Sequence, residues 1–220
     1  MTEGRGGSLA KQSLCRRVSV VGFILLKMAR ETEIKFVVAD PKALARRLRA
    51  CGFRLVTRRT HEMNVLYDGP GHPLRRRGEI LRLRQYGDRW TFTHKSKGTA
   101  RRHKSRQELE TAVANGASLD RILRALGFAP SFRYEKFRSE WADGQGHVVI
   151  DETPIGTVAE IEGRPRWIDR TAKLLDVPPT SYITLSYGAM FDEWKRRTGS
   201  PAKEMTFAAV TGGRNKKLSS

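Results

Sequence analysis

The sequence predicts an α+β fold built around an antiparallel β-sheet or barrel. Eight short runs of residues alternate in the manner of β-strands, and several are joined by turns that contain Gly or Pro. Helical segments are inserted between some of these strands, which favours a meander over a regular parallel arrangement. At 220 residues, the chain can bury one sizeable core but hardly two, so we expect a single domain.

The first elements are a strand and a helix. Charged side chains fall on one face of residues 31–38 and mainly apolar ones on the other, which predicts a strand with one buried face. Asp40 can cap a helix and Pro41 suits its first position. Because Gly52 is a typical stop signal, we expect this helix to cover residues 41–51.

Seven further strands and three further helices are expected after Gly52. One helix begins at Ser118, has Leu or Ile at helical spacing and ends at Gly127, and two more are expected near residues 169–176 and 187–197. The predicted strands are 61–67, 79–85, 89–95, 105–111, 133–141, 147–152 and 157–162.

The two ends of the chain differ in composition from its middle. We divide the sequence into an N-terminal extension (1–28), a folded domain (29–197) and a basic flexible tail (198–220), whose Gly, Ser and Lys content is typical of disorder. The apolar run 18–26 is too short to span a bilayer. We expect Met28 to be the true first residue; a weak peripheral anchor is the alternative for the apolar run.

The net charge of +19 suggests nucleic-acid binding, but its distribution does not support a specific site. Residues 1–30 carry +5 and residues 195–220 carry +6, which leaves +8 for residues 31–194. The basic loop 101–104 has no interleaved aromatic residues, so any binding of RNA there would be unspecific. Two cysteines are too few for a disulfide framework or a zinc site, and we expect a cytoplasmic protein. The oligomeric state is not readable from the sequence, and a homodimer is compatible with it only because dimers are common among soluble proteins.

Like-charged residues recur two apart on several predicted strands. Residues i and i+2 of a strand share a face, so each pair lies on one side of the sheet. Acids and bases are segregated by strand, although a merely solvated sheet gains from opposite charges across neighbouring strands. The acidic pairs are Glu31/Glu33, Glu108/Glu110 and Glu160/Glu162, the basic pairs are Arg82/Arg84, Lys95/Lys97 and Lys136/Arg138, and Lys35, Arg106 and Asp151 extend three of these strands.

This segregation predicts a binding site for a metal-bound polyphosphate. Carboxylates without sulfur or imidazole partners suit a hard divalent cation, Mg²⁺ or Mn²⁺, which shares phosphate oxygens. Arg and Lys side chains provide the complementary contacts to those oxygens. The alternative for any single pair is a solvated strand face whose mixed charges suppress edge pairing.

The ordered set of charged motifs resembles the CYTH superfamily, the triphosphate tunnel enzymes that include class IV adenylyl cyclases and thiamine or inorganic triphosphatases. The resemblance covers about residues 30–195, and the stretch His61–Asn64 departs from the more acidic one that we associate with the cyclases. The matching motifs are Glu31-x-Glu33-x-Lys35, Arg82-x-Arg84, Thr93-x-Lys95, Arg106-x-Glu108-x-Glu110, Lys136-x-Arg138, Asp151-Glu152 and Gly156 with Glu160-x-Glu162.

The resemblance implies an antiparallel eight-stranded tunnel whose interior carries these charges. It implies that metal is held by Glu31, Glu33, Asp151, Glu160 and Glu162, with Glu108 and Glu110 as further ligands or orienting groups. It implies that the triphosphate is held by Lys35, Arg82, Arg84, Lys95, Arg106, Lys136 and Arg138. Crowding by acids should keep Lys35 protonated, so we expect it to act on the reaction electrostatically.

Three functions follow as expectations. In the first, which we favour, the protein is an adenylyl cyclase that converts ATP to cyclic AMP and pyrophosphate. In the second, the same groups position water on the γ-phosphate, and the protein is a triphosphatase acting on inorganic, thiamine or nucleoside triphosphate. In the third, the protein binds polyphosphate or RNA without turnover; Glu31→Ala would then keep or raise its affinity, whereas an enzyme would lose turnover.

Overall fold

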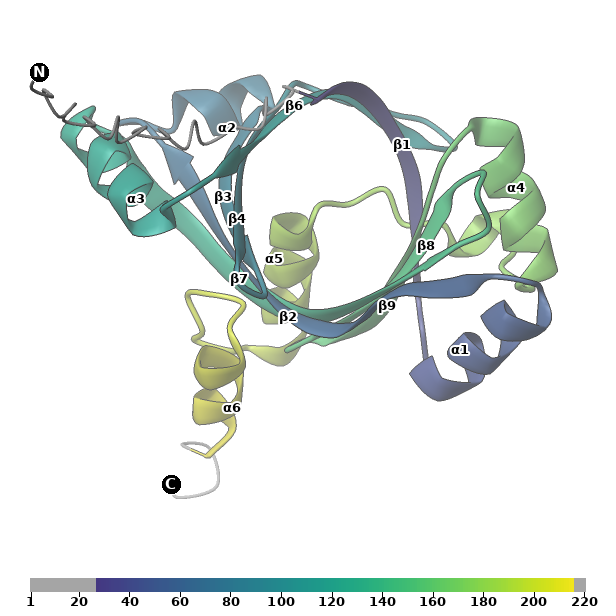
Figure 1. Ribbon diagram of the computed structural model, residues 1–220. Helices are drawn as coiled ribbons and strands as arrows, with labels where there is room; N and C mark the ends of the chain where they lie inside the picture. The colour runs from purple at the N-terminus through teal and green to yellow at the C-terminus, as the bar shows by residue number, and fades with distance from the viewer. Residues whose placement is uncertain (1–26, 216–220) are drawn as a thin grey trace, which may run out of the picture.

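Eight strands close into an antiparallel barrel in the computed structural model, which describes residues 27–215 (Figure 1). The order around the ring is β1, β9, β8, β7, β2, β3, β4 and β6, and β6 pairs back onto β1. The strands are β1 (Lys27–Val37), β2 (Arg54–Asp68), β3 (Ile80–Tyr86), β4 (Arg89–Lys95), β6 (Lys104–Val113), β7 (Ala129–Ala142), β8 (His147–Thr153) and β9 (Gly156–Glu162), with the two-residue β5 (Thr99–Ala100) beside β6. The predicted α+β fold with an eight-stranded barrel is confirmed.

β1 closes the ring because it has a partner on each side. Glu33 lies opposite Glu162 of β9, and Glu31 lies opposite Arg106 of β6. Strand β2 is longer than predicted: it begins at Arg54 and follows β7 through three register irregularities. Each strand of the ring therefore has two neighbours, which satisfies the backbone groups that an open sheet would leave at its edges.

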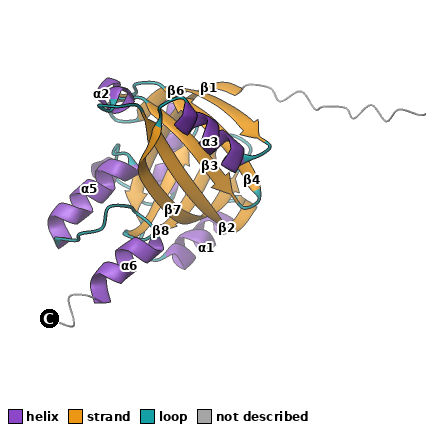
Figure 2. Ribbon diagram, turned by 90° about the vertical axis from the view of Figure 1, so that its left-hand side faces the viewer, coloured by secondary structure: helices purple, strands orange, loops and turns teal. Residues whose placement is uncertain are grey.

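Helices pack around the barrel, and the helix of residues 187–198 lies at one end of it (Figure 2). Asp40 caps the first, accepting hydrogen bonds of 2.9 Å from the backbone nitrogens of Lys42 and Ala43, as its sequence position predicts. The fourth starts at Pro165, four residues before the predicted segment. The helices are α1 (Pro41–Ala50), α2 (Pro73–Arg77), α3 (Gly116–Ala125), α4 (Pro165–Leu174), the short 3₁₀ turn Pro179–Ser181, α5 (Tyr187–Thr198) and α6 (Phe207–Asn215).

The main apolar core lies between the barrel wall and these helices. Ile34 of β1 and Ile161 of β9 point outward and are fully buried against Leu48 of α1 and Ile168 of α4. Alternation along β1 then turns Glu33 and Lys35 to the barrel interior, where they are also buried. The apolar face of the strands thus forms the core, and the charged face is left to line the interior.

The C-terminal segment corrects one prediction. Residues 198–220 were expected to form a flexible tail, yet Met205 forms a bridge to β7, with backbone hydrogen bonds of 3.1 Å from Glu135 and 3.0 Å to Arg133. Met205 and Val210 are buried against β7 and α5. The prediction of disorder was based on the average composition of the segment. It therefore did not take account of two single apolar residues, Met205 and Val210, whose burial holds the segment against the barrel. Residues 216–220 lie outside the described part of the chain.

The predicted N-terminal extension lies largely outside the described residues. Only its last two positions, Lys27 and Met28, belong to β1, where they pair with Glu110 and Leu109 of β6. The strand therefore starts earlier than predicted. Among residues 27–215, the longest apolar helical stretch falls short of what crossing a membrane requires.

We expect Met205→Ala to lower the free energy of unfolding by about 2–4 kcal/mol, the usual cost of truncating a large buried side chain. The Met205 side chain is 0% exposed and packs in the cluster that joins α5 and α6 to β7. Urea unfolding followed by circular dichroism measures the change. The exposed neighbour Lys203→Ala should change it by less than about 0.5 kcal/mol, and equal losses for both variants would show that this segment is not anchored to the barrel.

Candidate active site

A cavity of about 1420 Å³ occupies the barrel interior. Many of its charged lining residues alternate along β1, β3, β4, β6, β7 and β9, as the two-residue period of a strand requires, and others come from helices and loops. Of the residues predicted from the sequence, Asp151 lies behind the lining, and Lys97 is exposed beyond the end of β4. The others line the cavity: Glu31, Glu33, Lys35, Arg82, Arg84, Lys95, Arg106, Glu108, Glu110, Lys136, Arg138, Glu160 and Glu162.

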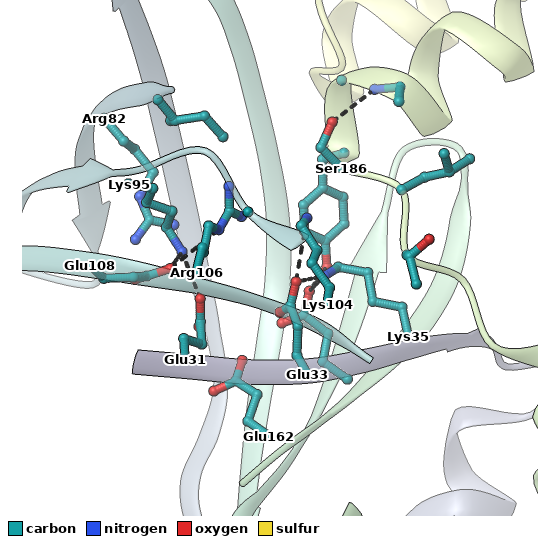
Figure 3. Close-up of a pocket in the computed structure, with 18 of the residues that line it drawn as sticks. Glu31, Glu33, Lys35, Arg82, Lys95, Lys104, Arg106, Glu108, Glu162 and Ser186 are labelled. Atoms are coloured by element: carbon teal, nitrogen blue, oxygen red, sulfur yellow. Dashed lines mark hydrogen bonds and ion pairs between the residues drawn. The ribbon is translucent and has the colours of Figure 1, made fainter. Parts of the chain in front are cut away.

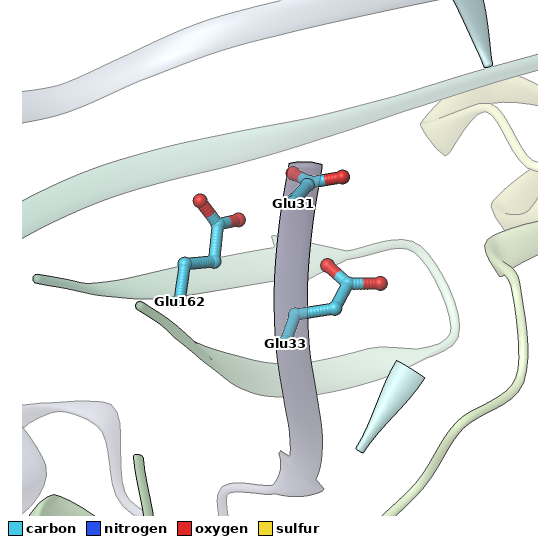
Figure 4. A group of neighbouring side chains, drawn as sticks. All are labelled: Glu31, Glu33 and Glu162. Carbon is cyan, nitrogen blue, oxygen red and sulfur yellow. The ribbon is translucent and has the colours of Figure 1, made fainter. Parts of the chain in front are cut away.

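Three of the predicted metal ligands form a carboxylate group on β1 and β9 (Figure 4). Glu31, Glu33 and Glu162 each offer a carboxylate oxygen, and these three oxygens lie within 4.8 Å of one another. The antiparallel register places Glu162 directly beside Glu33, and Glu31 follows on the same face of β1. The donor set is all oxygen, which fits a hard divalent cation such as Mg²⁺ or Mn²⁺.

The electrostatics of this group favour a bound cation. Burial, reinforced by the charges of Glu31 and Glu160, raises the pKa of Glu162 well above its ordinary value. Burial and the neighbouring Glu31 also raise the pKa of Glu108, to about 7. Burial acts in the same direction on Glu31, but Lys95 and Glu108 outweigh it and hold the Glu31 pKa below its usual range. A divalent cation would relieve the repulsion that disfavours charge on Glu162.

Two predicted metal residues lie against basic side chains of the barrel wall instead. Glu108 forms an ion pair with Lys95, whose Nζ is also 3.2 Å from Glu31 Oε2, and Figure 3 shows these groups facing one another. Glu110 lies 3.2 Å from Arg84 Nη2 and accepts a hydrogen bond of 2.8 Å from Thr93. The structure therefore places Glu108 next to the carboxylate group and Glu110 within the basic part of the lining.

Asp151 and Glu160 are also engaged with cations. Asp151 is 0% exposed and accepts hydrogen bonds from Lys136 (2.8 Å) and from Arg138 (2.7 Å from Nε and 2.6 Å from Nη2). Arg138 Nη2 also lies 2.7 Å from Glu160 Oε2. The carboxylates of Asp151 and Glu160 thus act as counter-ions that hold two basic side chains in place.

Lys35 lies between the carboxylate group and this buried network. Its Nζ is 2.5 Å from Glu33 Oε1 and 3.1 Å from Glu160 Oε1. Burial lowers the pKa of Lys35, but the charges of Glu160 and Glu33 outweigh burial and raise it above its ordinary value. Lys35 is therefore a permanent cation at neutral pH, suited to stabilise negative charge and not to accept a proton.

The basic side chains form a wall on β3, β4, β6 and β7, which we name the basic row. Arg82 and Arg84 lie on β3, and Lys136 and Arg138 lie on β7. Strand β2 separates these two strands in the sheet. Guanidinium and ammonium groups at several positions can bind successive phosphate groups of one chain. Its members are Arg82, Arg84, Lys95, Arg106, Lys136 and Arg138, all lining the cavity.

Three interior residues were missed by sequence reasoning. Lys104, assigned to a basic loop, lies 3.5 Å from Glu33, and burial together with the charge of Lys35 lowers its pKa to about 8. Lys104 lies two residues before Arg106, so both lie on the same face of the strand. This spacing could have predicted that Lys104 points into the barrel interior. Tyr187 donates a 2.5 Å hydrogen bond to Asp151 from the first turn of α5. Glu62 is fully buried beneath the basic row.

Comparisons with known proteins agree with this geometry. Residues 29–165 match the family model of the CYTH domain. A Methanocaldococcus jannaschii protein named "putative adenylate cyclase" is 24% identical over 147 residues, which cover 66% of this chain and 83% of that protein.

Two solved structures share the fold. A "putative adenylate cyclase" from Vibrio parahaemolyticus has a TM-score of 0.64 at 20% identity, covering 74% of this chain and 97% of that one. A Hippeastrum protein, described as a "putative adenylyl cyclase" with a dominant triphosphatase activity, has a TM-score of 0.55 at 20% identity, covering 74% and 95%.

Proposed function

The chain belongs to the CYTH domain family, and from this premise we propose that it is a divalent-metal-dependent enzyme that converts ATP to cyclic AMP and pyrophosphate. The observation that carries the proposal is the division of the cavity between a carboxylate group, Glu31, Glu33 and Glu162, and the basic row. A metal-bound triphosphate presents the complementary charges, because its cation needs oxygen ligands and its phosphates need cationic ones.

The size of the cavity supports a nucleotide over an inorganic chain of phosphates. At about 1420 Å³ it exceeds the roughly 300–1,000 Å³ of ordinary small-molecule pockets. Leu66 and Phe132 belong to its lining away from the carboxylate group, which provides apolar surface next to the phosphate-binding residues. The space and this surface suit an organic group attached to the triphosphate.

In the proposed reaction, the ribose 3′-hydroxyl loses its proton to water, its oxygen forms a bond to the α-phosphorus, and the bond from the α-phosphorus to the β-phosphate oxygen breaks to release pyrophosphate. Glu31, Glu33 and Glu162 would hold Mg²⁺ or Mn²⁺, which supplies Lewis-acid polarisation of phosphate oxygens and lowers the pKa of a bound hydroxyl. Arg82, Arg84, Lys136 and Arg138 would bind the β- and γ-phosphates and stabilise the charge that develops on pyrophosphate. Lys35, protonated beside Glu33 and Glu160, would neutralise charge near the α-phosphate.

The second candidate is a triphosphatase. The same phosphate contacts would position water on the γ-phosphorus, and the two reactions differ only in which phosphorus meets the nucleophile. The triphosphatase activity described for the Hippeastrum protein of the same fold is the observation that favours it.

Product analysis separates the candidates. We expect purified protein incubated with ATP and Mn²⁺ to form cyclic AMP and pyrophosphate in equal amounts, resolved by ion-exchange chromatography. ADP and phosphate without cyclic AMP would overturn the cyclase proposal in favour of the triphosphatase. Stable binding of ATP without any product would overturn both and leave the noncatalytic binder.

A further inference from the structure

Glu62, like Asp151, lies behind the basic row and outside the lining of the cavity. Glu62 of β2 is 0% exposed and lies opposite Lys136 in the register of β2 with β7. Its carboxylate is 3.4 Å from Lys136 Nζ, 3.8 Å from Arg138 Nε and 4.0 Å from Arg84 Nη1. Three members of the basic row therefore surround one buried negative charge that the ligand itself would not touch.

Glu62 differs from the other acids of the interior in how it contacts these cations. Arg84 donates its hydrogen bonds to Thr91 and Glu110, while Arg138 donates to Asp151 and Glu160. Glu62 accepts one hydrogen bond, of 2.9 Å, from Asn64. Among the described residues, its second oxygen is buried without a hydrogen-bond partner. Glu62 thus acts on the row through its charge while the hydrogen-bond donors of the row stay directed elsewhere.

The charge of Glu62 is stable in this environment. Burial raises the pKa of Glu62, but the nearby cations Lys136, Arg138 and Arg84 outweigh burial and hold it below the ordinary range. A buried carboxylate with a single hydrogen bond is normally costly, so the ionisation of Glu62 depends on the positive potential of the basic row. The same coupling acts in the other direction, because Glu62 lowers the potential that the row presents to an anion.

We propose that Glu62 is a positioning residue that sets the affinity of the basic row for phosphate chains and keeps it low enough for pyrophosphate to leave. The inference rests on the proposed function and deepens it. A fixed charge within a few ångströms of three phosphate-binding cations weakens their attraction for an anion by about tenfold or more at the effective dielectric of a protein interior. Binding the triphosphate too tightly would slow the release of its product.

Glu62→Gln tests the proposal because it removes the charge and keeps the shape. Isothermal titration calorimetry in metal-free buffer measures the binding of inorganic tripolyphosphate and pyrophosphate without any turnover. We expect both dissociation constants to fall about tenfold in the variant. With ATP as substrate, KM and kcat should both fall, because pyrophosphate leaves more slowly. A purely structural role predicts the opposite, since a disturbed row would bind more weakly.

Two further variants make the result specific. Glu62→Gln combined with Asn64→Asp restores one carboxylate to the buried, hydrogen-bonded pair that residues 62 and 64 form. We expect this double variant to bind both polyphosphates with wild-type affinity. Glu152→Gln, on the outer face of β8 where Glu152 pairs with Arg59, should leave both affinities unchanged. If Glu62→Gln loses stability, the dissociation constants can be taken from the shift in thermal midpoint with tripolyphosphate, which should be larger than in the wild-type protein.

The outcomes separate the two proposals. Wild-type protein that binds neither polyphosphate would overturn the proposed function and the role of Glu62 together. Wild-type binding with unchanged or weaker affinity in Glu62→Gln would overturn only the role of Glu62. Tighter binding in the variant, reversed by the second substitution, supports the inference whichever triphosphate reaction the enzyme catalyses.

Discussion

Glu162→Gln should reduce turnover of ATP by about 100- to 1,000-fold while leaving the barrel folded. Glu162 belongs to the three-carboxylate group of β1 and β9, and the transition-state stabilisation lost with a displaced metal is worth several kcal/mol. Each factor of ten corresponds to about 1.4 kcal/mol. The glutamine keeps the size of the side chain but removes its charge, so the metal is bound more weakly. Initial rates across a Mn²⁺ titration measure the loss.

A thermal unfolding series gives a readout of the same site without catalysis. Mn²⁺ at about 100 times its dissociation constant should stabilise the wild-type protein by about 2.7 kcal/mol and the Glu162→Gln variant by much less. Glu152→Gln, on the outside of the barrel, serves as the matched control and should respond to Mn²⁺ as the wild-type protein does. An equal Mn²⁺ response in Glu162→Gln would exclude Glu162 as a metal ligand.

Asp151→Ala should lower the free energy of unfolding by about 3–5 kcal/mol, the cost of removing one partner from a buried ion pair. Asp151 is 0% exposed and holds Lys136, Arg138 and the hydroxyl of Tyr187. Without it, two buried cations keep only Glu62 and Glu160 as counter-charges, and Tyr187 of α5 keeps only Glu160, at 3.0 Å, as a hydrogen-bond partner. Urea unfolding in metal-free buffer measures the effect.

The adjacent residue provides the control for this experiment. Glu152 follows Asp151 on β8 but points outward to an exposed ion pair with Arg59, so Glu152→Ala should cost no more than about 1 kcal/mol. The experiment also separates two roles of Asp151. If Asp151 were chiefly a metal ligand, Asp151→Ala would unfold like the wild-type protein in metal-free buffer and differ only when Mn²⁺ is added.

The barrel and the charged faces could be predicted because both depend on the two-residue period of a strand. Glu31, Glu33 and Lys35 alternate with residues such as Ile34, which is buried in the core outside the barrel wall. The side of the sheet on which each side chain lies could therefore be predicted without knowing which strands pair. Pairing itself was not readable from local pattern. Contacts between β1 and β9 join residues more than 120 positions apart, and this register decides that Glu162 meets Glu33.

The same limit explains how the predicted acids divide in the structure. From sequence, Glu108 and Glu110 form one pair, but their neighbours differ: Glu108 contacts Lys95, whereas Glu110 contacts Arg82 and Arg84. Glu62 carried no signal of this kind, because its partner at i+2 is Asn64 and not a second acid. Tyr187 depended on how α5 docks against the barrel, and Met205 on a short bridge to β7, both tertiary events.

Closure of the ring by β1 has a consequence for how the protein folds. The hairpins β3–β4 and β8–β9 form between residues close in sequence, but β1 must pair with both β6 and β9 across long stretches of the chain. Pairings of such high sequence separation are entropically costly and tend to limit the folding rate. Since Glu31 and Glu33 lie on β1 and Glu162 on β9, the three carboxylates come together only at this closing step. The proposed cation site therefore exists only in the completed barrel, and release of a cation bound there would report the opening of this seam during unfolding.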